Sequence, residues 1–236
     1  MQFDRQQSIL KYLKERQSAT IRELAEAVYT SEASVRRDLA VLETQGYVRR
    51  VYGGVVLAPA DNLIVPVDLR DGENAVAKNE VAKRAAEMIP NGSTLIMDAS
   101  STARRILKYL GNKGNLRIFT NNLRVFEDIG TIDAEVYCTG GIYNRRNHAF
   151  TGPAAESFIR SVSADLCFFS SQGISEAGEI TDVSEEETSL RREMLRRAKK
   201  RVFLCDESKL GVQRDFLLCN RDEVDEIVCN VKLPWE

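Results

Sequence analysis

The sequence contains a single histidine, His148, and its five cysteines form no C-x-x-C motif. One histidine cannot build a metal site from several imidazoles, and its polar surroundings argue against a serine-histidine triad. The cysteines lie mostly in apolar runs, which favours buried free thiols over metal ligands or a redox pair. We therefore expect neither a metal nor a cofactor.

The sequence also lacks long hydrophobic segments. No stretch approaches the ~20 apolar residues that a transmembrane helix needs, and the polar N-terminus, Met1 to Arg5, does not resemble a secretion signal. We expect a cytoplasmic protein with no membrane partner. The remaining composition, 43% apolar and 29% charged, is ordinary for a globular protein, and 236 residues leave room for two domains.

A short helix with a basic start is predicted over residues 31–45. Its apolar stripe is Val35, Leu39 and Leu42, spaced i, i+4 and i+7, while Ser31 can cap the start and Gly46 can end the helix. Two more amphipathic helices are predicted upstream, and the second opens at residues 20–23 with the spacing of a capping box. Three short helices in some fifty residues indicate a helix-turn-helix.

Residues 47–57 form two β-rich runs around a Gly-Gly pair and carry two adjacent arginines, which is typical of a hairpin wing. We predict a winged helix-turn-helix over residues 1–58. A helix inserted in a groove and a basic wing can reach phosphates and base edges of double-stranded DNA. The alternative interpretation of the charged helix is a solvent-exposed surface with no binding role. The predicted DNA contacts are Arg22, Ser31, Glu32, Ser34, Arg36, Arg37, Arg49, Arg50 and Tyr52.

Residues 59–75 contain prolines, glycine and several Asp and Asn residues, which predicts a linker. From residue 76 to 236, short apolar runs alternate with amphipathic stretches, so we predict an α/β domain with a mostly parallel sheet. The expected strands lie near residues 94–97, 116–119, 134–138, 164–169, 201–205 and 226–229, with helices near 102–110, 122–129 and 184–199.

Polar residues follow these apolar runs, and ligands of such sheets bind beyond the carboxyl ends of the strands. The polar segments lie at residues 98–102, 120–122, 139–141 and 206–209. Each has an ordinary structural explanation, such as a helix cap or a turn. Four of them at one edge indicate a small polar ligand carrying a phosphate.

The N-terminal pattern resembles the signature of the DeoR family of bacterial transcription regulators. The matching residues are Arg5, Ile9, Leu13, Ser31, Ser34, Val35, Arg36, Arg37, Asp38 and Leu39. The resemblance implies that Asp38 supports the helix rather than touching DNA. Ser34 stands where the family usually has threonine, which keeps the hydroxyl group.

The second half resembles the DeoR sensor domain, whose fold is similar to ribose-5-phosphate isomerase and glucosamine-6-phosphate deaminase. The resemblance implies a site for a phosphorylated sugar, made of Asp98, Ser100, Ser101, Thr102, Thr120, Asn121, Asn122, Gly140, Gly141, Arg146, Gly152, Gly173, Glu187, Asp206 and Lys209. Ser100, Asn144 and Ser170 depart from the family pattern. Added side chains narrow a pocket and a lost arginine removes an anion contact, which favours a smaller or differently charged ligand.

Together these features predict a repressor of a carbohydrate-metabolism operon. A phosphorylated sugar or related metabolite would change its affinity for the operator, and a homodimer or tetramer would read repeated half-sites. Two other functions stay open. The sensor-like half could be an isomerase-like enzyme, with Asp98, Glu187, Asp206 and Lys209 moving protons, or it could be an inert oligomerisation domain.

Overall fold

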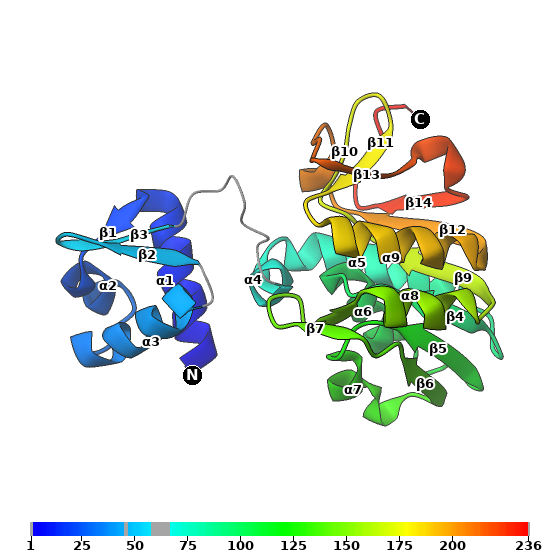
Figure 1. Cartoon of the computed structure of the whole chain (residues 1–236), viewed down its shortest axis with the longest axis horizontal. Coiled ribbons are helices and arrows are strands. Elements are labelled where there is room, and N and C mark those ends of the chain that lie inside the picture. The colour runs from blue at the N-terminus through cyan, green and yellow to red at the C-terminus, as the bar shows by residue number, and fades with distance from the viewer. Residues whose placement is uncertain (1, 45–46, 58–66, 236) are drawn as a thin grey trace. The chain divides into compact units, whose positions relative to one another are not determined.

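The computed structural model describes residues 2–44, 47–57 and 67–235. The chain divides into two compact units, residues 1–65 and 66–236, each with its own core (Figure 1). No helix in the described part of the chain is both long and apolar enough to cross a membrane.

The first unit is a winged helix-turn-helix, as predicted. Its elements are α1 (Gln2–Arg16), β1 (Ser18–Ala19), α2 (Ile21–Ala27), α3 (Glu32–Thr44), β2 (Val48–Val51) and β3 (Gly54–Leu57). The predicted stripe of α3, namely Val35, Leu39 and Leu42, is buried. Gly46, predicted to end this helix, lies outside the described residues.

Local chemistry explains the ends of these elements. Thr20 accepts a hydrogen bond from the Glu23 amide at 3.2 Å and Glu23 accepts one from the Thr20 amide at 2.7 Å, which completes the predicted capping box. The hairpin turns at Tyr52 and Gly53 rather than at the two glycines. Gly54 already belongs to β3, where a Cβ would lie 2.5 Å from the carbonyl oxygen of Ala19 on the paired strand β1.

The second unit is built on a six-stranded sheet in which every neighbouring pair is parallel. The strands are β4 (Thr94–Met97), β5 (Leu116–Thr120), β6 (Ala134–Cys138), β9 (Ala164–Phe169), β12 (Ala198–Cys205) and β14 (Glu226–Cys229). Their order is β14-β12-β9-β4-β5-β6, so the chain builds outward in both directions from the β4–β9 pair. All six predicted strands are confirmed, although β12 begins three residues early.

Successive residues of each strand point to opposite faces of the sheet, and each face packs against its own hydrophobic core. Leu95 and Met97 of β4 pack on one side with α5 (Ala75–Glu87) and α6 (Ser101–Arg105), while Ile96 packs on the other side with α8 (Pro153–Arg160) and α9 (Glu185–Arg196). Helices on both sides explain why the central strands are apolar throughout.

Several elements differ from the sequence prediction. The helix expected at 102–110 is α6 followed by a 3-10 helix (Ile106–Tyr109), and the helix expected at 122–129 shortens to α7 (Val125–Asp128). The prediction missed a hairpin, β7 (Ile142–Asn144) with β8 (Ala149–Thr151). It also missed a small antiparallel sheet of β10 (Gly173–Ile174), β11 (Glu179–Asp182) and β13 (Phe216–Asn220).

Helix α4 (Val67–Gly72) and the start of α5 lie inside the predicted linker, residues 59–75. Tertiary contacts explain why this segment is helical: Val67 is buried, and its amide donates to the carbonyl of Arg146 at 3.1 Å. Arg105 also donates to the carbonyl of Asp71. Residues 58–66 lie outside the described part.

Candidate functional sites

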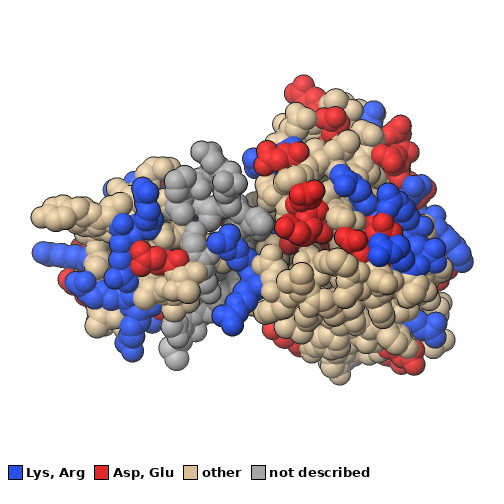
Figure 2. Space-filling view, in the orientation of Figure 1, with Lys and Arg blue, Asp and Glu red and all other residues tan. Residues whose placement is uncertain are grey.

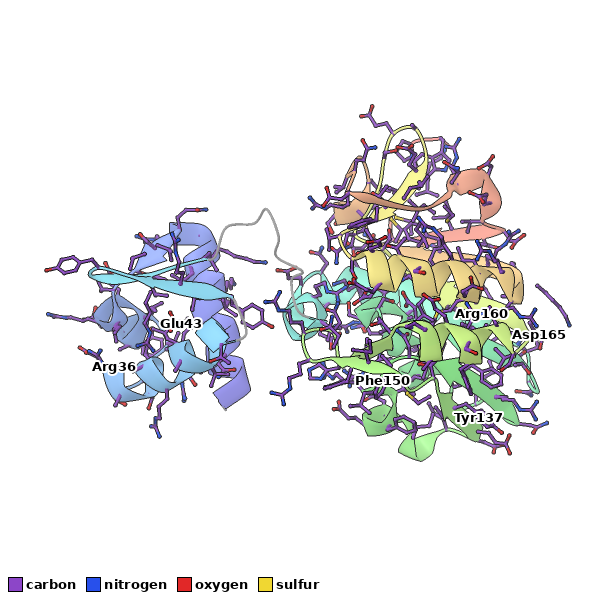
Figure 3. All side chains as sticks on the ribbon, viewed as in Figure 1. Arg36, Glu43, Tyr137, Phe150, Arg160 and Asp165 are labelled. Carbon is purple, nitrogen blue, oxygen red and sulfur yellow. The ribbon has the colours of Figure 1, made fainter. Side chains whose placement is uncertain are left out.

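The recognition helix α3 presents its arginines to solvent. The Arg36 guanidinium lies 3.3 Å from Glu32, and Arg37 donates to the Ser34 hydroxyl at 3.3 Å. Both arginines are exposed, and these weak contacts leave them free to turn toward another partner. Figure 3 labels Arg36 on this helix, and Figure 2 shows Lys and Arg side chains on the visible face of the unit.

Asp38 lies on the opposite, buried side of α3. Its carboxylate accepts hydrogen bonds from Arg5 at 2.5 Å and from Gln6 at 3.3 Å, and both donors belong to α1. Asp38 therefore ties the recognition helix to the first helix, which confirms its expected supporting role.

The wing is tied to the recognition helix by Arg50. Its Nε lies 3.1 Å from Glu43 and its Nη2 donates to the Arg36 carbonyl at 3.4 Å. Tyr52 is fully exposed at the turn of the hairpin.

The turn before α3 adds a residue that the sequence analysis missed. Tyr29 is 96% exposed at φ +51, a left-handed conformation that disfavours a bulky residue. With Arg22, Glu26 and Glu32 it lines an open surface groove. Arg22 pairs with Glu26 at 3.0 Å.

In the second unit, a small cavity lies where the chain reverses its direction of strand addition. The carboxyl ends of β4 and β9 meet at this switch point, which is where open parallel sheets bind ligands. The cavity is lined by Arg70, Lys78, Ser100, Ser101, Thr102, Ser170, Ser171, Asp182, Arg191 and Lys209.

Besides Arg191 of α9, three cationic side chains from three other elements line this cavity. Arg70 comes from α4, Lys78 from α5 and Lys209 from the short turn of 3-10 helix after β12. Burial lowers the pKa of Lys78 to about 8 and also lowers the pKa of Lys209. Within the described residues, the Lys209 ammonium makes no hydrogen bond or ion pair, and the buried Arg70 Nε has no acceptor.

The acidic residues beside the cavity are already held by an arginine. Arg191 of α9 contacts Asp98 at 2.8 Å, Asp182 at 2.9 Å and Glu187 at 2.9 Å, and all four side chains are buried. Burial alone would lower the pKa of Arg191, but the three carboxylates raise it above its ordinary value, so the guanidinium stays charged. The cluster brings Asp98 and Glu187 together, as expected, around an arginine that the sequence analysis missed.

Hydroxyl groups form the rest of the lining. The Ser100 hydroxyl caps α6 by accepting from the Ala103 amide at 3.1 Å, and the Ser170 hydroxyl donates to the Leu204 carbonyl at 2.7 Å. These two departures from the family pattern are therefore engaged with the protein's own backbone. The hydroxyls of Ser101 and Thr102 make no hydrogen bond to any described residue.

The predicted residues after β5 and β6 do not line this cavity. Asn121 and Asn122 contact the neighbouring hairpin: the Asn121 side-chain amide donates to the Phe150 carbonyl at 2.9 Å, and Asn122 forms an isolated β-bridge with Ala149. The Thr120 hydroxyl accepts from the Asn122 backbone amide at 3.1 Å. The remaining predicted positions outside the lining are Asp98, Gly140, Gly141, Arg146, Gly152, Gly173, Glu187 and Asp206.

Backbone geometry accounts for several of these positions. A Cβ at Gly173 would lie 2.3 Å from the Val212 carbonyl oxygen, and Gly152 caps α8 at φ +88. Asn144, the third departure, accepts from the Arg146 amide at 2.9 Å and so holds the turn of the β7–β8 hairpin.

Asp206 is not among the residues that line the cavity, and the protein holds only one of its two carboxylate oxygens. One carboxylate oxygen accepts from Asn74 at 3.0 Å and from Ser208, while the other is buried without a partner.

The sequence analysis did not predict Arg70, Lys78, Asp182 and Arg191 as lining residues. Arg70 lies in the segment predicted to be a linker, and the other three lie in charged stretches that are typical of solvent-facing surfaces. No local spacing in the sequence marks them.

Comparison with known proteins covers both units. The model of the DeoR-like helix-turn-helix domain matches residues 5–60, and that of the DeoR C terminal sensor domain matches residues 73–230. The transcriptional regulator GolR of Listeria innocua is 31% identical over 98% of this chain and 91% of its own. The glycerol-3-phosphate regulon repressor of Escherichia coli is 30% identical, covering 89% of this chain and 83% of its own.

Among solved structures, the chain is similar to ribose 5-phosphate isomerase A from Methanocaldococcus jannaschii. That alignment covers 58% of this chain and 55% of the isomerase, at 17% identity and a TM-score of 0.42. The two family matches together span nearly the whole chain, and the full-length relatives are regulators. The chain belongs to the DeoR family of DNA-binding transcriptional regulators.

Proposed function

We propose that this regulator represses its target genes and that an anionic metabolite, a phosphorylated sugar or polyol, binds the cavity at the β4–β9 switch point. The observation that carries this proposal is the set of donors without acceptors: Lys209 Nζ, Arg70 Nε and the hydroxyls of Ser101 and Thr102. A phosphate supplies several acceptor oxygens to such donors. It would also compensate the burial of Lys78 and Lys209.

The DNA-binding surface proposed here comprises the exposed side of α3, the wing arginines Arg49 and Arg50, and Tyr52. One recognition helix contacts few base pairs, so we propose that two copies bind two half-sites, either as a dimer or within a tetramer. Regulation of transcription by such a protein takes place on DNA in the cytoplasm.

Sensing suits this cavity better than catalysis. An isomerase-type proton transfer needs a carboxylate free to gain and lose a proton beside the substrate. Asp98 and Glu187 instead form ion pairs with Arg191, which lines the cavity. Asp206 accepts hydrogen bonds from Asn74 and Ser208 with one carboxylate oxygen, and it is not among the residues that line the cavity.

The test is a thermal-shift screen of the full chain with sugar phosphates and polyol phosphates, beginning with glycerol 3-phosphate because of the relative named for that regulon. Ligand that binds only the folded state raises the melting temperature with concentration. The Lys209→Ala variant should lose the shift, while Lys199→Ala, an exposed lysine paired with Asp165, should keep it. Equal shifts in both variants would show that the ligand binds elsewhere.

DNA binding is tested separately with fluorescent duplexes taken from the region upstream of the gene. The active ligand should change the affinity of the wild-type chain by about 5- to 150-fold, the usual range of allosteric coupling. A ligand that shifts the melting temperature but leaves DNA affinity unchanged would refute the regulatory role of the cavity.

A further inference from the structure

Strands β5 and β6, at one side of the parallel sheet, are only partly covered on one face. Arg117 and Phe119 of β5 and Glu135 and Tyr137 of β6 point to the same side, because they alternate with residues of the buried core. Parallel sheets are normally covered on both faces. On this side, the ring of Phe158 in α8 contacts the ring of Phe119, with the two centroids 6.0 Å apart. Among the described side chains, this is the one aromatic contact between a helix and these two strands.

This side of the unit is apolar and aromatic. Tyr137 stacks on Phe119 with centroids 5.0 Å apart and is 40% exposed, and Ile142 on the adjoining hairpin is 68% exposed. Ile142 lies against the N-terminal end of α8, since a Cβ at Gly152 would come within 3.1 Å of its side chain. We call Phe119, Tyr137, Ile142 and Phe158 the aromatic face. Figure 2 shows an uncharged area over this part of the second unit, and Figure 3 labels Tyr137 in it.

The charges at the border of the aromatic face are self-complementary. Arg117 lies 3.4 Å from Glu135, and both side chains are more than half exposed. In a two-fold assembly the same surface meets itself, so Arg117 of one copy can face Glu135 of the other without like-charge repulsion. An uncharged centre bordered by one charge of each sign suits a second copy of the same surface.

We propose that two copies of this chain associate through the aromatic face. The proposal rests on the two-copy assembly proposed above and names the surface that forms it. A second copy would cover the exposed part of β5 and β6 and remove a group of exposed apolar side chains from water.

The experiment measures the mass of the full chain by light scattering and sedimentation across a range of concentrations. Wild type should be at least a dimer, and the Tyr137→Glu, Ile142→Glu double variant should dissociate at least about tenfold more readily, because buried like charges are costly. The matched control is Leu217→Glu on β13, which is 41% exposed and outside the aromatic face. Its mass should equal that of wild type.

Charge-swap variants keep the proposal testable should the double variant fold poorly. Arg117→Glu and Glu135→Arg each remove the pair within one chain and place like charges across the two-fold interface, so each alone should be more monomeric. Mixing the two single variants restores opposite charges between copies and should restore the dimer. A monomeric wild type, or a folded double variant of unchanged mass, overturns the proposal. Ligand binding is measured separately, by melting-temperature shifts with sugar phosphates. A chain that binds no sugar phosphate would therefore leave both mass measurements unaffected.

Discussion

Replacing Arg191 by methionine should be among the most destabilising single changes in the second unit. The substitution keeps most of the side-chain volume but removes a buried guanidinium that contacts Asp98, Asp182 and Glu187 at 2.8–2.9 Å. Breaking a buried ion pair by deleting one partner costs about 3–5 kcal/mol, because the other charge stays buried without compensation. For a domain of this size, each kcal/mol lowers the melting temperature by ~2–4 °C, which predicts a fall of roughly 6–20 °C.

The control lies on the same helix. Arg196 pairs with Glu193 at 2.5 Å, but its side chain is 65% exposed, so Arg196→Met should change stability by about 1 kcal/mol or less. Adding Asp182→Asn to Arg191→Met removes one uncompensated carboxylate and should recover part of the loss. Urea unfolding followed by circular dichroism measures all three variants. If Arg191→Met and Arg196→Met were equally stable, the electrostatic account of the cluster would be wrong.

Three further predictions concern other parts of the molecule. Removing Arg36 and Arg37 together, as alanine substitutions, should reduce the salt dependence of duplex binding by about two units of slope in a plot of log affinity against log salt, measured by fluorescence anisotropy. Burial lowers the pKa of Lys78 to about 8, so its positive charge is present below that pH and lost as the pH rises through it. The affinity for a phosphate ligand, measured by calorimetry, should therefore fall from pH 7 to 9. Lys78→Arg should flatten this pH profile. Tyr29→Gly should raise the stability of the first unit by about 1 kcal/mol by relieving the left-handed conformation at φ +51, whereas Tyr52→Gly, which is equally exposed but has no such strain, should give no gain in thermal unfolding.

The first unit could be predicted because its signals are local. A stripe such as Val35, Leu39 and Leu42 or a capping box such as Thr20–Glu23 depends on neighbours within one or two turns of helix. The same reasoning found the parallel strands, whose apolar runs are continuous. It failed at α4, because the helix is held there by Val67 and Arg105 contacts to segments far along the chain.

The cavity could be predicted only in part, for a related reason. Residues 98–102 follow a strand at the switch point and sit where the rule for parallel sheets places them. Residues 120–122 satisfy the same rule, yet they follow β5, which is one strand away from the switch point, and they contact the β7–β8 hairpin. Strand order decides between these two segments, and strand order depends on long-range pairing that no short motif contains.

Net charge is a poor guide to what this second unit can bind. Residues 59–236 carry 24 basic and 28 acidic side chains, a balance that on its own would argue against an anion site. Three of those acids, Asp98, Asp182 and Glu187, form ion pairs with Arg191, which lines the cavity. Two lysines of the same lining, Lys78 and Lys209, remain without a carboxylate in ion-pair contact among the described residues. The field inside a small buried cavity is set by the charges that contact its contents, since more distant surface charges are screened by solvent and salt. An acidic segment can therefore hold a phosphate, and neutralising exposed acids on its surface should leave phosphate affinity nearly unchanged.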